Sequence, residues 1–211
     1  LNGRDVAATP RGVMVIDLFG LTVEDVRDRF PAVFQHVAET VKPERDNNNR
    51  DTYRDNWWLF GEPRRDLRPA LQGLPRYIVT IETAKHRFFQ FLDASVLPDN
   101  KLIAIGVADP ALLAVLSSFV HCAWFQANAG KIGVYALDSG YVKSKCFDAF
   151  PFPGLDETKQ MELARLGNRL DAFRTDRIAD VPGLTMTKLY NALERAREVE
   201  AGANAGSLSE E

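Results

Sequence analysis

The chain has 211 residues, of which 45% are hydrophobic, and it carries a formal net charge of −3. This composition excludes a disordered chain, and the small negative charge excludes an overall attraction to nucleic acid while leaving room for a local basic face. The two cysteines, Cys122 and Cys146, fit neither a disulfide framework nor a metal site, so we expect a cytoplasmic protein. No apolar run reaches the roughly 18 residues of a membrane span, and there is no signal peptide, so we expect no membrane partner. Because the sequence begins with Leu1 and not methionine, we expect a fragment of a longer chain.

The N-terminal part of the sequence predicts a strand followed by a helix. Residues Gly12–Asp17 (GVMVID) have the composition of a short buried strand. The segment Leu21–Val41 is predicted to be helical, with Thr22 as its N-cap and Asp25 at the position of a near capping box. Pro31 should break or restart this helix.

The middle of the sequence predicts strands, a helix and a hairpin. Asp109 is placed to cap a helix that begins at Pro110 and ends near Ala129. The segment Lys131–Phe147 (KIGVYALDSGYVKSKCF) predicts a hairpin with its turn near Asp138–Gly140. Enrichment in β-branched and aromatic residues predicts strands at Arg76–Ile81, His86–Asp93 and Lys101–Val107.

A joint of aromatic residues and prolines precedes the C-terminal part. In Phe150-Pro151-Phe152-Pro153 each proline biases the preceding phenylalanine away from helix, so we expect one ring in each neighbouring core. Beyond it, a second helix is predicted with Thr185 or Thr187 as its cap. The first helix after the joint is predicted from an apolar stripe at helical spacing, formed by Met161, Leu163, Leu166, Leu170 and Phe173.

These elements predict an α/β (mixed α+β) domain with a helical appendage. We expect the mixed domain in residues 1–153 and a small C-terminal helical subdomain in residues 154–199. The small and polar residues 200–211 predict a disordered tail.

The sequence carries no catalytic or metal-binding signature. It lacks the glycine-rich dinucleotide motif, the P-loop and the serine nucleophile elbow. His121 and Cys122 are adjacent, but neighbouring residues of a helix point about 100° apart, and this helix is apolar, so we expect both in the core. His36 and His86 have no partner for a metal site. The carboxylates are evenly spread, so we expect no catalytic residue in this chain.

Two polar segments fit DNA recognition. Between Lys42 and Arg87 the chain has ten lysines and arginines against seven acids, and arginine and asparagine are the residue types that recognise guanine and adenine and hold phosphates. The alternative is a solvated, asparagine-rich loop with local ion pairs. Trp57 and Trp58, inside this segment, are expected in the core and not stacked on bases.

The second segment is the predicted hairpin. On one strand, Tyr141, Lys143 and Lys145 would share a face by the two-residue period, and a two-stranded ribbon fits the major groove. The alternative is an ordinary edge hairpin whose lysines block further strand pairing.

Several motifs in one order resemble a known family. From Leu1 to about Arg197, the chain resembles the target-recognition region and C-terminal helical region of MmeI-like type II restriction–modification enzymes. Those proteins are single-chain, adenine-specific DNA methyltransferases, and most carry an endonuclease as well. The motifs that carry the resemblance are LNGRDV, VMVIDLFGLTVEDVRDRFP, VKPERDNNNRDTYRDNWWLFGEPRRDLRPAL, LPRYIVTIETAKHRFFQFLD, LLAVLSS, CFDAFPFP and LTMTKLYNAL.

The resemblance implies sequence recognition on behalf of a catalytic domain elsewhere in a bacterial parent polypeptide. The Asn-Pro-Pro-aromatic motif that holds the flipped adenine is absent, as is the glycine motif for S-adenosylmethionine; the nearest string is Asp109–Ala111. We therefore expect no cofactor in this fragment, and S-adenosylmethionine, with Mg²⁺ if a nuclease is present, in the parent. The expected partners are double-stranded DNA and the methyltransferase domain of the same polypeptide.

In this family the specificity residues cluster just before the Phe-Pro-Phe-Pro joint. That position predicts base contacts by Tyr135, Leu137, Asp138, Ser139, Tyr141 and Lys143. Asp138 would accept from cytosine N4, and Lys143 would donate to guanine O6 and N7. Phosphate contacts are predicted for Arg50, Arg54, Lys85, Arg87 and Lys145. The alternatives are a protein-interaction or scaffold domain without DNA contact, and a stand-alone nuclease or hydrolase.

Overall fold

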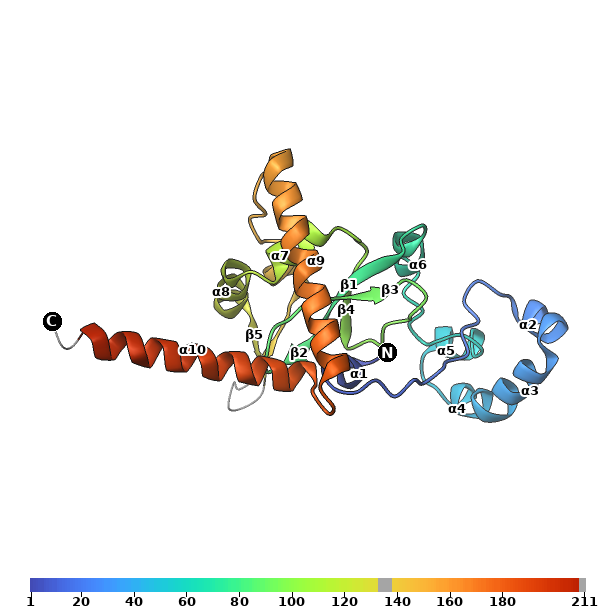
Figure 1. The fold of residues 1–211 in the computed structure, drawn as a ribbon. Coiled ribbons are helices and arrows are strands. Elements are labelled where there is room, and N and C mark those ends of the chain that lie inside the picture. Colours follow the sequence, from blue (N-terminus) through green and yellow to red (C-terminus); the bar gives the residue numbers. More distant parts are fainter. Residues whose placement is uncertain (133–137, 209–211) are drawn as a thin grey trace. The chain divides into compact units, whose positions relative to one another are not determined.

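The computed structural model describes residues 1–132 and 138–208, and the chain divides into two compact units. Unit 1 comprises Leu1–Arg11 and Ala70–Glu211, and unit 2 comprises Gly12–Pro69. The boundary expected at residue 153 does not separate compact units, because the C-terminal helices belong to unit 1. Helices and small antiparallel sheets together give the mixed α and β fold predicted from the sequence, with a helical C-terminal part (Figure 1).

Unit 2 is built from short helices. Thr22 caps the first of them: its hydroxyl accepts from the Asp25 backbone at 3.1 Å, and the Asp25 carboxylate accepts from the Thr22 backbone at 3.0 Å. This is the predicted capping box in full. Pro31 is the first residue of the next helix, as expected from its fixed φ. The helices are α2 (Val23–Arg29), α3 (Pro31–Thr40), α4 (Lys42–Asp46) and α5 (Asp51–Asp55), with α6 (Leu67–Leu71) at the boundary with unit 1.

The core of unit 2 is small and aromatic. It contains Leu18, Val26, Val37 and Trp57, and Trp58 packs against it while donating its Nε1–H to the Leu21 carbonyl at 2.9 Å. Both tryptophans therefore have the packing role that we expected.

The strand predicted at Gly12–Asp17 is not formed. Within the described residues, neither sheet includes this segment, and Met14 is 90% exposed. A strand needs a neighbour for its backbone N–H and C=O groups, and composition alone does not supply one.

Unit 1 contains two small antiparallel sheets in the described part of the chain. The first has the order β3-β1-β4, and the second has the order β2-β6-β5. Strand β1 lies at the centre of the first sheet and is buried over all but its first residue, which fits its run of apolar residues. The strands are β1 (Arg76–Ile81), β2 (Thr83–Ala84), β3 (Gln90–Asp93), β4 (Leu102–Ile105), β5 (Gly130–Ile132) and β6 (Asp138–Gly140).

Helices pack around these sheets. The single helix expected from Pro110 is two, because the Ser118 hydroxyl accepts from the His121 backbone at 3.2 Å and caps a new helix. The last helix continues to Leu208, so residues 200–208, expected to be disordered, are helical. The helices are α1 (Gly3–Ala7), α7 (Pro110–Leu116), α8 (Phe119–Asn128), the short π-helix η1 (Lys143–Phe147), α9 (Glu157–Asp180) and α10 (Met186–Leu208).

In the part of the chain that the structure describes, no single helix is long and apolar enough to cross a membrane. Helices α7 and α8 reach that length and composition only together, across a bend of 54°.

Helix α9 lies against α7 through an unusually close backbone contact (Figure 1). A Cβ atom at Gly167 would lie 2.0 Å from the Pro110 carbonyl oxygen, so only glycine fits there. Farther along the same face, Arg174 is buried and donates to the Phe89 carbonyl at 2.7 Å and to the Tyr190 hydroxyl. The helix therefore buries a glycine and an arginine.

The predicted apolar stripe of α9 does not form one buried face. Met161, Leu166 and Phe173 are 61%, 41% and 51% exposed, while Leu163 and Leu170 are half-buried. The prediction from hydrophobic spacing identified the helix, but only Leu163 and Leu170 of the stripe lie on its buried side.

Candidate nucleic-acid interface

The segment predicted to contact bases is built on the second sheet. Strand β6 lies between β2 and β5, and Ser139 is the register partner of both Ala84 and Lys131. Asp138–Gly140, where the hairpin turn was expected, forms this central strand instead. Tyr135 and Leu137 lie outside the described residues. Of Asp138 and Ser139 the structure describes the backbone, which places both on β6.

Tyr141 follows β6 and points into the protein core. Its backbone N–H donates to the Glu82 carbonyl at 2.7 Å, its side chain is 2% exposed, and its hydroxyl is 3.2 Å from His121 Nε2. Its ring packs on Phe125 at 5.7 Å between centroids. The interpretation of Tyr141 as a base contact is therefore corrected, because a fully packed ring cannot reach a base edge.

The Phe-Pro-Phe-Pro joint is anchored by one of its two rings. Phe150 is 7% exposed and packs edge-on against His121 at 4.6 Å and Trp124 at 5.9 Å. Phe152 is 40% exposed and contacts Phe150 and Phe147. The expectation of one ring in each core is right for Phe150 and wrong for Phe152, which stays at the surface.

His121 connects Tyr141 and Phe150 in the interior. It is fully buried, as expected, whereas its neighbour Cys122 is only partly buried. Burial, helped by the guanidinium of Arg87, lowers the pKa of His121 from 6.5 to about 4. The ring is therefore neutral over the physiological range and packs as an aromatic residue.

The pKa of His121 predicts a pH-dependent stability. Between pH 6.5 and about 4 the unfolded chain binds a proton at His121 that the folded protein does not, so this contribution to stability is complete above pH 6.5 and is lost as the pH falls toward 4. We expect the melting temperature of the wild-type protein to fall more steeply over this range than that of His121→Gln. If the melting temperatures of the two proteins fall equally from pH 7 to pH 4, His121 does not have the lowered pKa.

The exposed lysines of the candidate interface lie on η1. The backbone N–H groups of Lys145 and Cys146 both donate to the Val142 carbonyl, at 3.0 Å and 2.7 Å, so the chain turns directly after Tyr141. The strand face predicted for Tyr141, Lys143 and Lys145 is therefore not formed. Instead, Cys146 is buried while both lysines are exposed.

Both lysines are available to a ligand. Lys143 is 72% exposed, and its ammonium lies 3.2 Å from the Asp148 carboxylate. Such a surface ion pair is worth about 1 kcal/mol or less, so a phosphate or a base edge can replace it. Lys145 is fixed through its backbone carbonyl, which accepts from Trp124 Nε1 at 3.2 Å. The lysine backbones are thus held in place while their side chains face solvent.

Arg87 is an interior residue. It is 8% exposed and donates to the Thr80 hydroxyl at 2.9 Å and to the Ile81 carbonyl, with its guanidinium 5.1 Å from the centroid of the Tyr141 ring. Burial lowers the pKa of this guanidinium to about 10, which leaves it charged at neutral pH. The predicted phosphate contact is corrected to a structural role.

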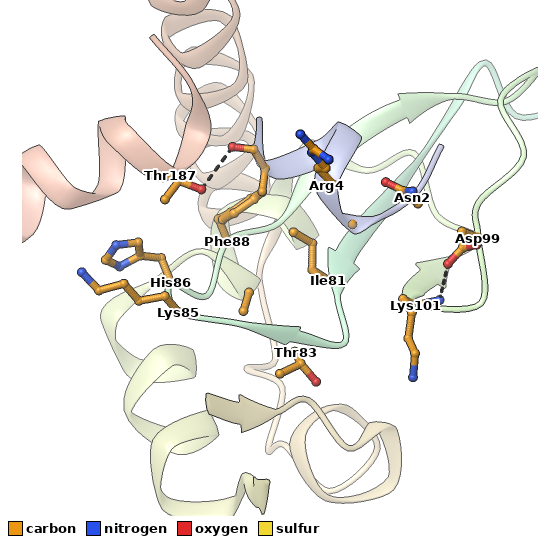
Figure 2. A pocket seen from close by; sticks show the side chains of 13 residues that line it. Asn2, Arg4, Ile81, Thr83, Lys85, His86, Phe88, Asp99, Lys101 and Thr187 are labelled. Carbon is orange, nitrogen blue, oxygen red and sulfur yellow. Dashed lines mark hydrogen bonds between the residues drawn. The ribbon is translucent and has the colours of Figure 1, made fainter. Parts of the chain in front are cut away.

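Lys85 lies at the rim of a cavity of about 490 Å³ in unit 1 (Figure 2). The floor of the cavity includes the buried Ile81 and Phe88, and its rim includes Arg4 and Lys101. Sequence reasoning missed Arg4 and Lys101, because each is an isolated cation in its own segment and only the fold brings them to the cavity that Lys85 also lines.

Lys85 is already engaged by α10. Its ammonium donates to the Asn191 side-chain carbonyl at 2.9 Å and to the Glu194 carboxylate at 3.1 Å, while the side chain stays 61% exposed. A phosphate at Lys85 would therefore have to compete with Glu194.

Arg50 and Arg54, the other predicted phosphate contacts, belong to unit 2. Arg50 is 67% exposed, and the Glu62 carboxylate lies 3.9 Å from its Nη1. Arg54 is more engaged, because it donates to the Asn48 carbonyl at 2.6 Å and to the Asp51 carboxylate. Arg50 is thus the more available of the two.

The site contains no arrangement for metal chemistry within residues 1–132 and 138–208, where no group of three or more His, Cys, Asp or Glu side chains is placed to hold an ion.

Comparison with known proteins gives one informative result. No protein-family model matches the chain, and no curated protein does. Among solved structures, the chain is similar to that of the type IIL restriction-modification enzyme MmeI in complex with DNA, with 18% sequence identity and a TM-score of 0.64. The match covers 82% of this chain and 22% of that chain, so this chain spans well under half of the solved protein. At this identity, the likeness shows a shared fold.

Proposed function

We propose that this chain is the sequence-specific, double-stranded DNA recognition module of a larger adenine-N6 DNA methyltransferase, with or without an endonuclease. The observation that carries the proposal is the fold shared, over 82% of this chain, with part of an enzyme solved on DNA. The ordered motifs of the sequence support it separately, because they extend over both units.

In this proposal the base contacts come from the segment that ends at η1. Asp138, Ser139 and Lys143 are the candidates within the described residues, and Tyr135 and Leu137, which lie outside them, are proposed from the sequence alone. Lys143 can exchange the Asp148 carboxylate for guanine O6 and N7, at little cost for so exposed an ion pair. Lys145, Lys85, Arg50 and Arg54 supply phosphate contacts, which fix the register without selecting a sequence.

The proposal places no methyl-transfer chemistry on this chain. S-adenosylmethionine and the flipped adenine need the two motifs that the sequence lacks, so both are assigned to the methyltransferase domain of the parent, the second proposed partner. Any Mg²⁺ used for cleavage is likewise assigned to the parent.

Duplex binding tests the proposal directly. We expect the logarithm of the binding constant for duplex DNA to fall linearly with the logarithm of the salt concentration. The slope should be about 0.9 for each phosphate contact. Lys145→Ala should lower that slope by about one unit. Lys159→Ala is the control, because this lysine of α9 is likewise exposed, at 66%, and lies outside the segment that ends at η1. Fluorescence anisotropy with a labelled duplex measures the salt slope of both variants.

Sequence preference tests the role of Lys143. In the full-length parent, Lys143→Ala should change the accepted base pair, measured by mapping methylated adenines across a genome. In the duplex-binding experiment, association of the chain with DNA that does not depend on salt, or no association, would instead favour a protein-interaction domain without DNA contact. An unchanged methylation map for the Lys143 variant would remove Lys143 from the base contacts.

A further inference from the structure

Two arginines of unit 2 stack on a single tyrosine, and a third arginine is linked to them through a carboxylate. The guanidinium carbons of Arg45 and Arg50 lie 4.7 Å and 5.4 Å from the centroid of the Tyr53 ring. Glu62 lies beside them, with its carboxylate 3.9 Å from Arg50 Nη1 and 2.9 Å from Arg64 Nη2. We call these five residues the Tyr53 cluster; it combines three cations with one carboxylate and therefore has an excess of positive charge.

The Tyr53 cluster is held in place by the backbone. A Cβ atom at Gly61 would lie 2.3 Å from Tyr53 Cε1, so the ring lies directly on the Gly61 backbone. Arg64 has a φ of 48°, in the left-handed region that residues other than glycine rarely adopt. Unusual backbone conformations of this kind are concentrated at functional sites.

The charged groups of the cluster face solvent. The side chains of Arg50, Glu62 and Arg64 are 67%, 54% and 64% exposed. The strained backbone at Arg64 therefore presents a guanidinium to solvent and buries nothing. Exposed ion pairs such as those of Glu62 contribute little to stability, so ion pairing alone does not account for the arrangement.

We propose that the Tyr53 cluster binds a phosphodiester of the DNA backbone, and that the Glu62 carboxylate occupies this place in the free protein. Guanidinium groups form paired, charge-assisted hydrogen bonds with carboxylate and phosphate alike. A phosphate that binds at the cluster displaces the Glu62 carboxylate from Arg64. The negative charge of Glu62 repels this phosphate. The inference rests on the proposed DNA-binding function and deepens the phosphate contact proposed there for Arg50: it adds Arg45 and Arg64 to that contact and makes Glu62 the group that competes for it.

The sign of the Glu62 effect distinguishes this site from general attraction. In the full chain, Glu62→Gln should bind a labelled duplex of random sequence about fivefold more tightly at low salt, the effect of removing one unit charge about 4 Å from a phosphate. Asp46→Asn is the matched control, because it removes the same charge from unit 2 at a carboxylate that pairs with Lys42, outside the cluster. The control should change the affinity much less.

The arginines should have the opposite effect. Arg45→Ala and Arg64→Asn should each lower the salt slope by about 0.9 units. Asparagine is chosen at position 64 because it tolerates a positive φ. Arg29→Ala is the control, because its guanidinium stacks on Phe30 in the same unit without belonging to the cluster. Melting temperatures of all the variants show whether unit 2 stays folded.

Each outcome decides one claim. Wild-type binding that falls with salt, with cluster variants behaving like Asp46→Asn and Arg29→Ala, overturns this inference and leaves the proposed function standing. A wild-type chain that does not bind duplex DNA overturns both. If Glu62→Gln gains affinity for polyglutamate and none for the duplex, the cluster is a site for an acidic protein and the inference is wrong.

Discussion

Replacing Gly167 with alanine is expected to lower the free energy of unfolding by about 2 kcal/mol, the middle of the range for overpacking a tight interface. Alanine is the better helix former by about 1 kcal/mol, so propensity alone would stabilise α9. The new Cβ atom would, however, lie 2.0 Å from the Pro110 carbonyl oxygen, which is backbone and cannot rotate away. Helix α9 must then separate from α7, and the contacts between the two helices are weakened along their length.

Thermal unfolding measures this effect, with Gly154→Ala as the matched control. No heavy atom lies within 4 Å of the position of a Cβ at Gly154, so alanine there should leave stability unchanged or raise it slightly by restricting the unfolded chain. For a chain of this size, the Gly167 variant should melt several degrees lower, at about 2–4 °C per kcal/mol. Equal melting temperatures for the two variants would show that α9 does not approach α7 so closely.

Replacing Tyr141 with alanine is expected to cost about 3–5 kcal/mol of stability, the range for removing a buried aromatic side chain. Its ring packs on Phe125 and edge-on to Phe89, and the guanidinium of Arg87 lies over it. Tyr141→Phe keeps the ring and loses only the hydroxyl contact with His121, which should cost about 0.5–1.5 kcal/mol.

The same two variants decide whether Tyr141 contacts a base. Because the ring is internal, Tyr141→Phe should leave the methylation pattern of the parent unchanged. Urea denaturation of the chain and methylation mapping of the parent give the two results. A new sequence preference in the phenylalanine variant, with stability unaffected, would place the hydroxyl at the DNA and contradict the buried position.

The elements that the sequence predicted well depend on near neighbours. The capping box of Thr22 and Asp25 closes within one turn, and Pro31 can only begin a helix or interrupt one. Strand β1 has the bounds predicted from its composition, because its β-branched and aromatic residues fit a buried strand. In each case the signal lies within a few residues of the structure it specifies.

The predictions that failed depend on residues far apart in the chain. Tyr141, Lys143 and Lys145 match the period of a strand, but Cys146 is drawn into the core and the chain turns. Arg87 lies in a polar segment, yet its guanidinium is accommodated in the interior, over the rings of Phe125 and Tyr141. Of the candidate site, the exposure of Lys143 and Lys145 was predictable; the burial of Tyr141 and Arg87 required the tertiary fold.

The segment from Tyr141 to Phe150 combines buried residues that stabilise the fold with exposed residues that do not. Both aromatic residues contact His121, and Cys146 between them is buried in the core cluster that contains Tyr141, while Lys143 is exposed. Exposed residues such as Lys143 can therefore be exchanged with little effect on the fold around them. Under the proposed function, new DNA targets could be acquired here by point changes, because the exposed residues and the residues that stabilise the fold are different ones.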